Sequence, residues 1–159
     1  MNISENMLKW LMRLYPPMLF QRIWVTKVHK AFRGIDVKIN KSLFTTNLGN
    51  SIFGGTIFTA TDPFYALLFG QIFRNKGLKI TVWLKSAGIQ YIKPGRTDLY
   101  YTILITEEMI AEAEQTLSKE GKFIKSYPIE IYDRAGVLCA SAENEIYIRN
   151  LNFERNPSD

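Results

Sequence analysis

A long apolar segment at residues 51–73 limits what this chain can fold into more than any other feature. The segment is 23 residues long, and Asp62 is its only charged residue. That length reaches the range of membrane-spanning helices. However, it contains three glycines and Pro63, and a carboxylate in the middle of a bilayer is costly. We therefore predict a buried helix at the centre of a globular core.

The rest of the sequence predicts about six strands. Residues 23–29 and 35–41 are predicted as two short strands around a turn at Arg33-Gly34. Four more strands are predicted after the apolar segment, at residues 78–93, 98–105, 122–133 and 136–149. The first of these four has a predicted bulge near Ser86–Gly88.

Two further helices are predicted outside the apolar segment. An amphipathic N-terminal helix is indicated by four apolar residues at i, i+3, i+4 and i+7: Met7, Trp10, Leu11 and Leu14. Pro16-Pro17 ends that helix. Thr106 is a typical N-cap for a later helix, which Gly121 ends.

These elements favour an α+β fold. An antiparallel sheet must cover its apolar face, and only the segment at 51–73 is long and apolar enough to do so. We predict a sheet of about six strands wrapped around one long central helix, with an extra N-terminal helix. The prediction is one domain over residues 1–159, with residues 1–20 as a helical extension and 150–159 as a polar tail.

Composition excludes several classes of site. The chain of 159 residues has one cysteine and one histidine, so it can form neither an internal disulfide nor a Cys/His zinc cluster. Cys139 falls in the outward-facing set of its predicted strand. The net charge of +5 comes from scattered basic residues, and we expect no nucleic-acid partner. A reducing, cytoplasmic setting fits best, and we expect no bound metal.

The order of elements, with Asn47, Gly54-Gly55 and Asp62 around the start of the helix, resembles the hotdog-fold thioesterase-like superfamily. The resemblance covers residues 23–149. The runs GGTIFTATDPF and VWLKSAGIQYIKPGR are most similar to an uncharacterised bacterial branch of that superfamily. Many of its members are described as thioesterases or as proteins of unknown function.

The resemblance implies a catalytic arrangement for the hydrolysis of acyl-coenzyme A. In catalytic branches, the backbone N–H of a glycine polarises the thioester carbonyl, and an acid acts as general base or nucleophile. By position, Gly54 and Gly55 match the glycines, Asp62 matches the acid, and Asn47 matches the asparagine of the preceding loop. No cofactor is implied beyond the coenzyme A of the substrate. Homodimers with sites at the subunit interface are implied, and tetramers are left open.

Three residues depart from the catalytic pattern. Phe53 stands where catalytic branches usually have histidine, and Leu84 stands where a polar residue often holds the attacking water or the acid. Pro63 directly after the acid is also unusual. These departures leave open an alternative, in which Phe53 and Leu84 make the pocket apolar and the protein is a non-catalytic acyl- or lipid-binding homodimer.

The spacing of Gly55 and Asp62 requires two chains for a working site. Seven residues of helix separate them by roughly 10 Å. One carbonyl cannot lie about 3 Å from both groups of one chain. An acyl ligand also needs an apolar slot, for which Phe58 and Phe64 are candidates, and partners for its phosphates, for which the candidates are Arg74, Lys93 and Arg96.

Each of these residues also has a purely structural interpretation. Asp62-Pro63 could begin a helix at Pro63, with Asp62 as its N-cap. Asn47 could be a turn residue, and Gly54-Gly55 could serve close packing. The N-terminal amphipathic segment, with Trp10, Arg13 and Trp24, leaves open a protein attached to a membrane surface, although membrane contact is not expected.

Overall fold

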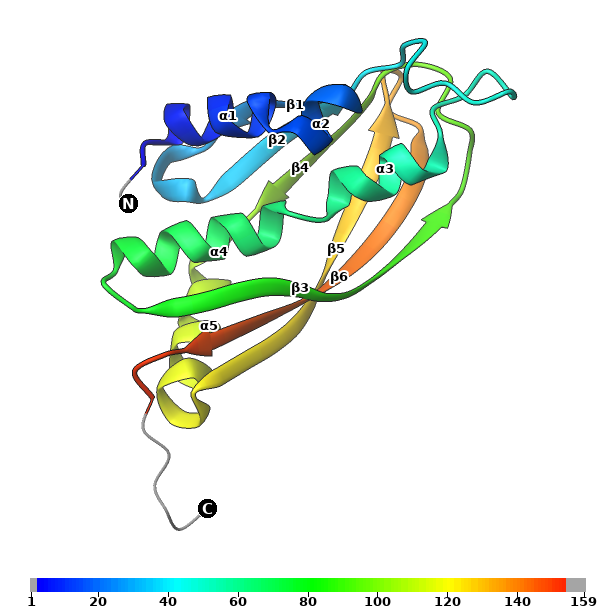
Figure 1. Ribbon diagram of the computed structural model, residues 1–159. Coiled ribbons are helices and arrows are strands. Elements are labelled where there is room, and N and C mark those ends of the chain that lie inside the picture. Colours follow the sequence, from blue (N-terminus) through cyan, green and yellow to red (C-terminus); the bar gives the residue numbers. More distant parts are fainter. Residues whose placement is uncertain (1–2, 154–159) are drawn as a thin grey trace.

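The computed structural model describes residues 3–153 and contains one six-stranded antiparallel sheet (Figure 1). The expected tail at 150–159 therefore lies mostly outside the described residues. The strands occur in the order β1 (Ile23–Val28), β2 (Gly34–Ile39), β4 (Leu99–Leu104), β5 (Lys122–Asp133), β6 (Leu138–Asn150) and β3 (Ile80–Tyr91). The predicted α+β class and number of strands are confirmed.

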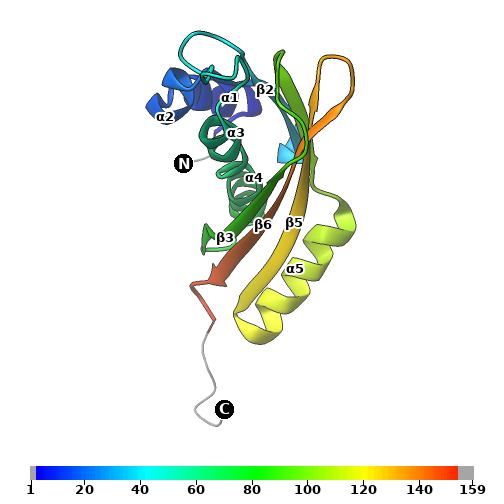
Figure 2. The same cartoon turned by 90° about the vertical axis from the view of Figure 1, so that its right-hand side faces the viewer.

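The helices occupy both sides of the curved sheet (Figure 2). The sheet wraps around α3 (Gly54–Thr61) and α4 (Phe64–Asn75), whereas α5 (Glu107–Glu120) packs on the outside. α1 (Glu5–Leu14) and the short α2 (Pro16–Phe20) pack beside β1, and the 3-10 turn η1 (Lys30–Phe32) links β1 to β2. Among the described residues, no helix is long and apolar enough to cross a membrane.

The central helix differs from the prediction because it is two helices, α3 and α4, broken at Asp62-Pro63. Pro63 has no N–H to donate to the carbonyl of Thr59. The N–H of Asp62 donates to that carbonyl instead, at 3.3 Å. The break therefore follows directly from the position of the proline.

Two side chains of the sheet donate hydrogen bonds to the backbone just before this break. The hydroxyl of Tyr101 on β4 donates to the carbonyl oxygen of Ala60. The side-chain amide of Asn144 on β6 donates to the carbonyl oxygen of Thr61 at 2.7 Å. Both side chains are buried, so they satisfy carbonyls at the end of α3 that water cannot reach.

The burial of Cys139 differs from the predicted alternation of side chains along β6. The side chain was expected to face outward, but it is only 2% exposed. The pairing of β5 with β6 shifts register between Ile131 and Tyr132, which leaves Cys139 as an extra residue on β6. Burial, and then the charge of Asp133, raise the pKa of its thiol.

β3 forms one edge of the sheet. It pairs with β6, and its register shifts between Leu84 and Ser86, close to the predicted bulge. Within residues 3–153 no strand pairs with its other side. The 12 residues of β3 therefore offer a long free edge next to α3 and α4.

Candidate functional site

Six of the eleven residues predicted for the site line two separate hollows. The first, of about 260 Å³, is the glycine-end hollow, and it is lined by Asn47, Ser51, Ile52, Gly54, Ile57, Tyr91, Ile92, Lys93, Pro94 and Gly95. The second, of about 300 Å³, is the acid groove, and it is lined by Asp62, Pro63, Ala66, Leu67, Gly70, Arg74, Val82, Trp83 and Leu84. Gly54 and Asp62 therefore line different hollows.

The glycine end presents two unpaired backbone donors. The carbonyl of Phe53, which precedes α3, accepts from the N–H groups of Thr56 and Ile57 at 3.0 and 3.2 Å. Among the described residues, nothing accepts from the N–H groups of Gly54 and Gly55. The start of a helix also carries a partial positive charge. The pair can therefore stabilise a carbonyl oxygen that gains negative charge.

Packing against aromatic rings accounts for both glycines. A Cβ on Gly54 would lie 3.0 Å from the ring of Tyr91 on β3, and the Tyr91 hydroxyl donates to the Gly54 carbonyl at 2.8 Å. Burial raises the pKa of that hydroxyl. A Cβ on Gly55 would clash with the ring of Phe53, which is 58% exposed. Each glycine thus lies against an aromatic ring, Gly54 against Tyr91 of β3 and Gly55 against the exposed Phe53.

Asn47 holds its own loop. Its side-chain oxygen accepts from the N–H of Gly49 at 3.0 Å, and from both the N–H and the hydroxyl of Ser51 at 3.1 Å. This is the arrangement of an Asx turn. The side chain also lines the glycine-end hollow, so it shapes the hollow through the loop.

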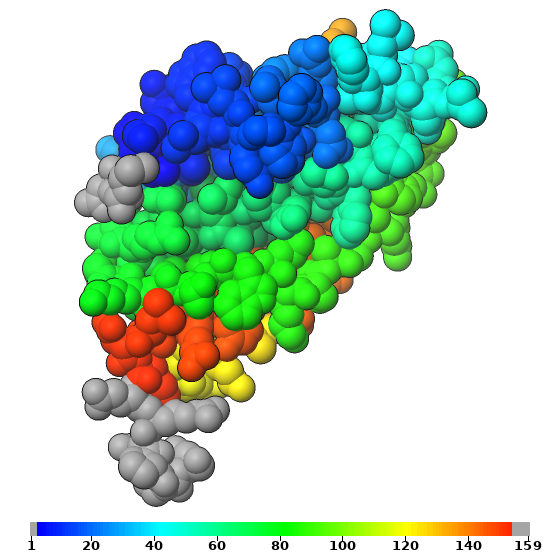
Figure 3. All heavy atoms as spheres, viewed as in Figure 1, coloured from blue at the N-terminus to red at the C-terminus, as the bar shows by residue number. Residues whose placement is uncertain are grey.

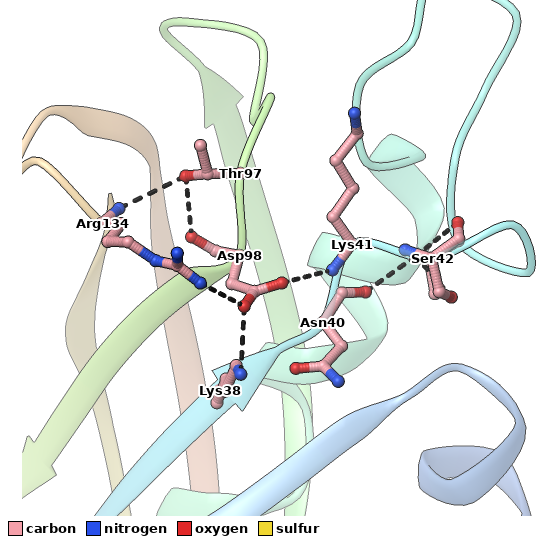
Figure 4. A network of polar contacts seen from close by, with 8 residues as sticks. Lys38, Asn40, Lys41, Ser42, Thr97, Asp98 and Arg134 are labelled. Carbon is pink, nitrogen blue, oxygen red and sulfur yellow. Dashed lines mark hydrogen bonds and ion pairs between the residues drawn. The ribbon is translucent and has the colours of Figure 1, made fainter.

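Asp98 anchors the start of the same loop (Figure 4). Its carboxylate accepts from the N–H of Lys41 at 2.9 Å and contacts the charged groups of Lys38 at 3.0 Å and Arg134 at 3.1 Å. Desolvation opposes ionisation of Asp98, but the hydrogen bonds from Lys41, Lys38 and Arg134 outweigh it and lower its pKa. Asp98 therefore ties the loop to β2 and to the β5–β6 turn.

Asp62 is an exposed carboxylate at the end of α3. Among residues 3–153 its side chain makes no hydrogen bond or ion pair, and α4 has Pro63 at its N-cap position, without a side-chain cap. The interpretation of Asp62 as the N-cap of a helix that starts at Pro63 is therefore wrong. The break directs the backbone so that this carboxylate lines the acid groove.

Leu84 and Arg74 lie in the acid groove with Asp62. Leu84 provides an apolar wall from β3, and Arg74 is an exposed cation in the last turn of α4. Trp83, on the same strand, stacks on Tyr147 at 4.2 Å between ring centroids. The groove therefore combines a carboxylate, an apolar wall and a cation.

The remaining candidates are more scattered. Phe64 was expected to line a slot, but it is fully buried, because it lies on the side of α4 that faces the core. Its ring centroid lies 6.3 Å from that of Tyr101. Phe58 is partly exposed on α3, and Lys93 lines the glycine-end hollow. Arg96 is exposed and lines neither hollow.

Sequence reasoning missed Tyr91, Tyr101 and Asn144 as residues that shape the site. Tyr91 lines the glycine-end hollow, and the other two hold the helix break. The available signal was an asparagine at an inward-facing position of β6, since a buried polar side chain requires a partner. In the described part of the chain, no three His, Cys, Asp or Glu side chains cluster as metal ligands.

Solved structures share this fold at low sequence identity. The protein PA5026 from Pseudomonas aeruginosa, described as a probable thioesterase, has a TM-score of 0.79 and 15% identity, covering 94% of this chain and 98% of its own. Thioesterase HI1161 from Haemophilus influenzae has a TM-score of 0.67 and 13% identity, with 98% and 97% covered. The E. coli PaaI protein, from the phenylacetic acid degradation operon, has a TM-score of 0.58 and 13% identity, with 94% and 97% covered.

These likenesses establish a hotdog fold. No curated protein sequence matches the chain. The model of one family, described as a domain of unknown function (DUF4442), matches residues 4–148. The chain therefore belongs to the DUF4442 family, and its sheet and central helices form a hotdog fold.

Proposed function

We propose that this protein is an acyl-coenzyme A thioesterase that acts as a homodimer, with each site built from two chains. One observation carries the proposal: unpaired N–H groups at Gly54 and Gly55 and an exposed carboxylate at Asp62 lie at opposite ends of α3. Gly54 and Asp62 line different hollows, and seven residues of helix separate Gly55 from Asp62 by roughly 10 Å. A second chain is the simplest way to bring the two chemistries together.

The free edge of β3 supports this assembly. Tyr91, near the end of β3, lines the glycine-end hollow, whereas Val82 and Leu84 line the acid groove. Antiparallel pairing of β3 with its copy, centred near Ser86, would place Tyr91 opposite the start of the partner's strand. The glycine-end hollow of one protomer would then face the acid groove of the other.

The proposed reaction is hydrolysis of the thioester bond. The N–H of Gly55 polarises the carbonyl, while Asp62 of the partner subunit removes a proton from water that attacks the carbonyl carbon. The oxyanion collapses and breaks the carbon–sulfur bond. The coenzyme A thiolate leaves and takes up the proton held by the carboxyl group. The products are a carboxylic acid and the free thiol.

The surroundings suit an acyl-coenzyme A. Leu84 and the exposed part of Phe58 offer apolar surface to an acyl chain. Lys93 and Arg74 are exposed cations at the two hollows, where they can meet phosphate oxygens. We place the protein in the cytoplasm, in keeping with its single buried free thiol, Cys139.

A second candidate is a non-catalytic dimer that binds an acyl group or lipid. It is favoured by the two apolar residues next to the proposed chemistry, Phe53 at the glycine end and Leu84 in the acid groove. Neither side chain can hold a water molecule by hydrogen bonds.

Turnover separates the two candidates. We expect hydrolysis of at least one member of a panel of acyl-coenzyme A thioesters of increasing chain length, followed by release of the thiol. Asp62→Asn should lower kcat by about 10²–10⁴-fold. Glu143→Gln removes an exposed carboxylate from β6 and should leave kcat unchanged. No turnover of any thioester, together with saturable binding of one of them, would favour the non-catalytic dimer.

A further inference from the structure

α1 turns an apolar face to solvent. It buries Leu8 and Met12, but its predicted apolar stripe is exposed: Met7 by 41%, Trp10 by 49%, Leu11 by 46% and Leu14 by 64%. α1 therefore has more large apolar side chains than it buries against the core. An exposed stripe of large apolar side chains usually marks an interaction surface.

The same surface continues beyond α1. Phe20, at the end of α2, is 74% exposed, and the loop after β2 exposes Leu43 and Phe44. A hollow of about 330 Å³ connects the two segments and is lined by Leu19, Phe20, Arg22 and Phe44. Figure 3 shows α1, α2 and this loop along one side of the molecule, from blue to cyan. We call this surface the N-terminal rim.

The N-terminal part of the chain, which includes α1 and α2 of the rim, carries the excess positive charge. Residues 1–35 contain one acidic residue, Glu5, and six basic residues: Lys9, Arg13, Arg22, Lys27, Lys30 and Arg33. Their net charge of +5 equals that of the whole protein, because 14 basic and 14 acidic residues balance in the remainder. Lys9, Arg13 and Arg22 lie on the rim itself, which is therefore cationic as well as apolar.

Basic side chains of the rim lie over its aromatic rings. Lys9 and Arg13 lie 5.5 and 5.2 Å from the ring centroid of Trp10, and Arg22 lies 5.2 Å from that of Phe44. Arg13 also donates to the carbonyl of Val25 at 2.8 Å, and Glu5 accepts from the N–H of Ala31 at 2.8 Å. The helix is therefore anchored to the sheet with its apolar face already formed.

We propose that the N-terminal rim docks on the surface of a bilayer that contains anionic phospholipids. Trp and Leu side chains would enter the headgroup boundary, and the basic residues would meet lipid phosphates. A second copy of this chain fits less well, since the basic residues Lys9, Arg13 and Arg22 of two facing rims would repel each other. The proposal concerns surface attachment, and it does not depend on the reaction proposed for Asp62.

Sedimentation with vesicles tests the proposal. The full chain should pellet with vesicles of phosphatidylcholine and phosphatidylglycerol, and much less with phosphatidylcholine alone. Leu11→Ser combined with Leu14→Ser should weaken binding at least about tenfold, since both exposed side chains lose their apolar contact. Leu151→Ser removes an equally exposed leucine from another surface and should bind as the wild type.

Charge and fluorescence give two independent readouts. Lys9→Glu should weaken binding to anionic vesicles, whereas Lys122→Glu, an exposed lysine at the start of β5, should not. Vesicles should shift the tryptophan emission to shorter wavelength in wild type and in Trp83→Phe, but not in Trp10→Phe. Asp62→Asn should bind vesicles normally, which separates docking from turnover.

Three outcomes would overturn the proposal. The first is no binding of the wild type to anionic vesicles above its pelleting without lipid. The second is an equal loss of binding in the rim variants and in their controls. The third is a smaller oligomer for the Leu11→Ser, Leu14→Ser variant without lipid, which would make the rim a contact between copies. Circular dichroism of each variant verifies that it is folded.

Discussion

The side-chain amide of Asn144 donates a 2.7 Å hydrogen bond to the main-chain oxygen of Thr61, the last residue of α3. The two residues are 83 positions apart in the sequence, and the Asn144 side chain is completely buried. The bond ties β6 to the point where the central helix breaks. It therefore helps to determine where the Asp62 carboxylate lies.

Removal of this bond should destabilise the fold. Asn144→Leu keeps the approximate volume of the side chain but leaves the Thr61 carbonyl without its buried donor. We expect a loss of about 1–3 kcal/mol in the free energy of unfolding, measured by urea denaturation. Asn152→Leu, which changes an exposed asparagine, should alter stability by less than about 0.5 kcal/mol. Equal effects of the two variants would contradict a role for the bond.

The stability of Asp62 variants should distinguish a cap from a free carboxylate. Because the Asp62 side chain has no partner among the described residues, Asp62→Ala should change the free energy of unfolding by less than about 0.5 kcal/mol. Thr106→Ala is the matched positive control, since the Thr106 hydroxyl accepts from the N–H of Met109 at 3.3 Å at the start of α5. That variant should lose about 1 kcal/mol. A comparable loss in Asp62→Ala would show that Asp62 caps a helix.

Mixing two inactive variants should restore activity if each site uses two chains. Gly55→Val obstructs the approach to the glycine end, and Asp62→Asn removes the carboxylate. Random exchange of subunits makes half of the dimers mixed, and each mixed dimer has one intact site, so about a quarter of wild-type activity should return. Thiol release after incubation of the equimolar mixture measures this. No recovery in a mixture shown to exchange subunits would place both groups in one chain.

Asp98 should make stability depend on pH. The hydrogen bonds and charges around Asp98 lower its pKa in the folded protein, below the unfolded value of about 3.9. Its contribution is therefore complete above about pH 4 and is lost as pH falls through the folded pKa. Asp98→Asn should cost about 1–2 kcal/mol at pH 7 and less at pH 3, by urea denaturation. The exposed control Glu143→Gln should show no such difference, and a constant effect of Asp98→Asn would contradict the shift.

Local patterns in the sequence predicted most elements of this fold, but neither the division of the central helix into α3 and α4 nor the short helix α2. Alternation of apolar residues and turn signals predicted six strands, and the apolar segment at 51–73 predicted a central helical region. The N-cap at Thr106 and the left-handed Gly121, with φ of 71°, confirm the predicted limits of α5. These features depend on neighbours within a few residues, which is why they can be predicted from one chain.

Tertiary structure decided what the sequence left open. Pro63 requires a break in the helix, and Tyr101 and Asn144, from strands distant in the sequence, bind the backbone at that break. Asp62 then lies in the same groove as Leu84. Burial of Phe64 and exposure of Trp10 likewise depend on which face of each helix meets the sheet. A helical pattern specifies that an apolar face exists, whereas only long-range packing determines which apolar residues it covers.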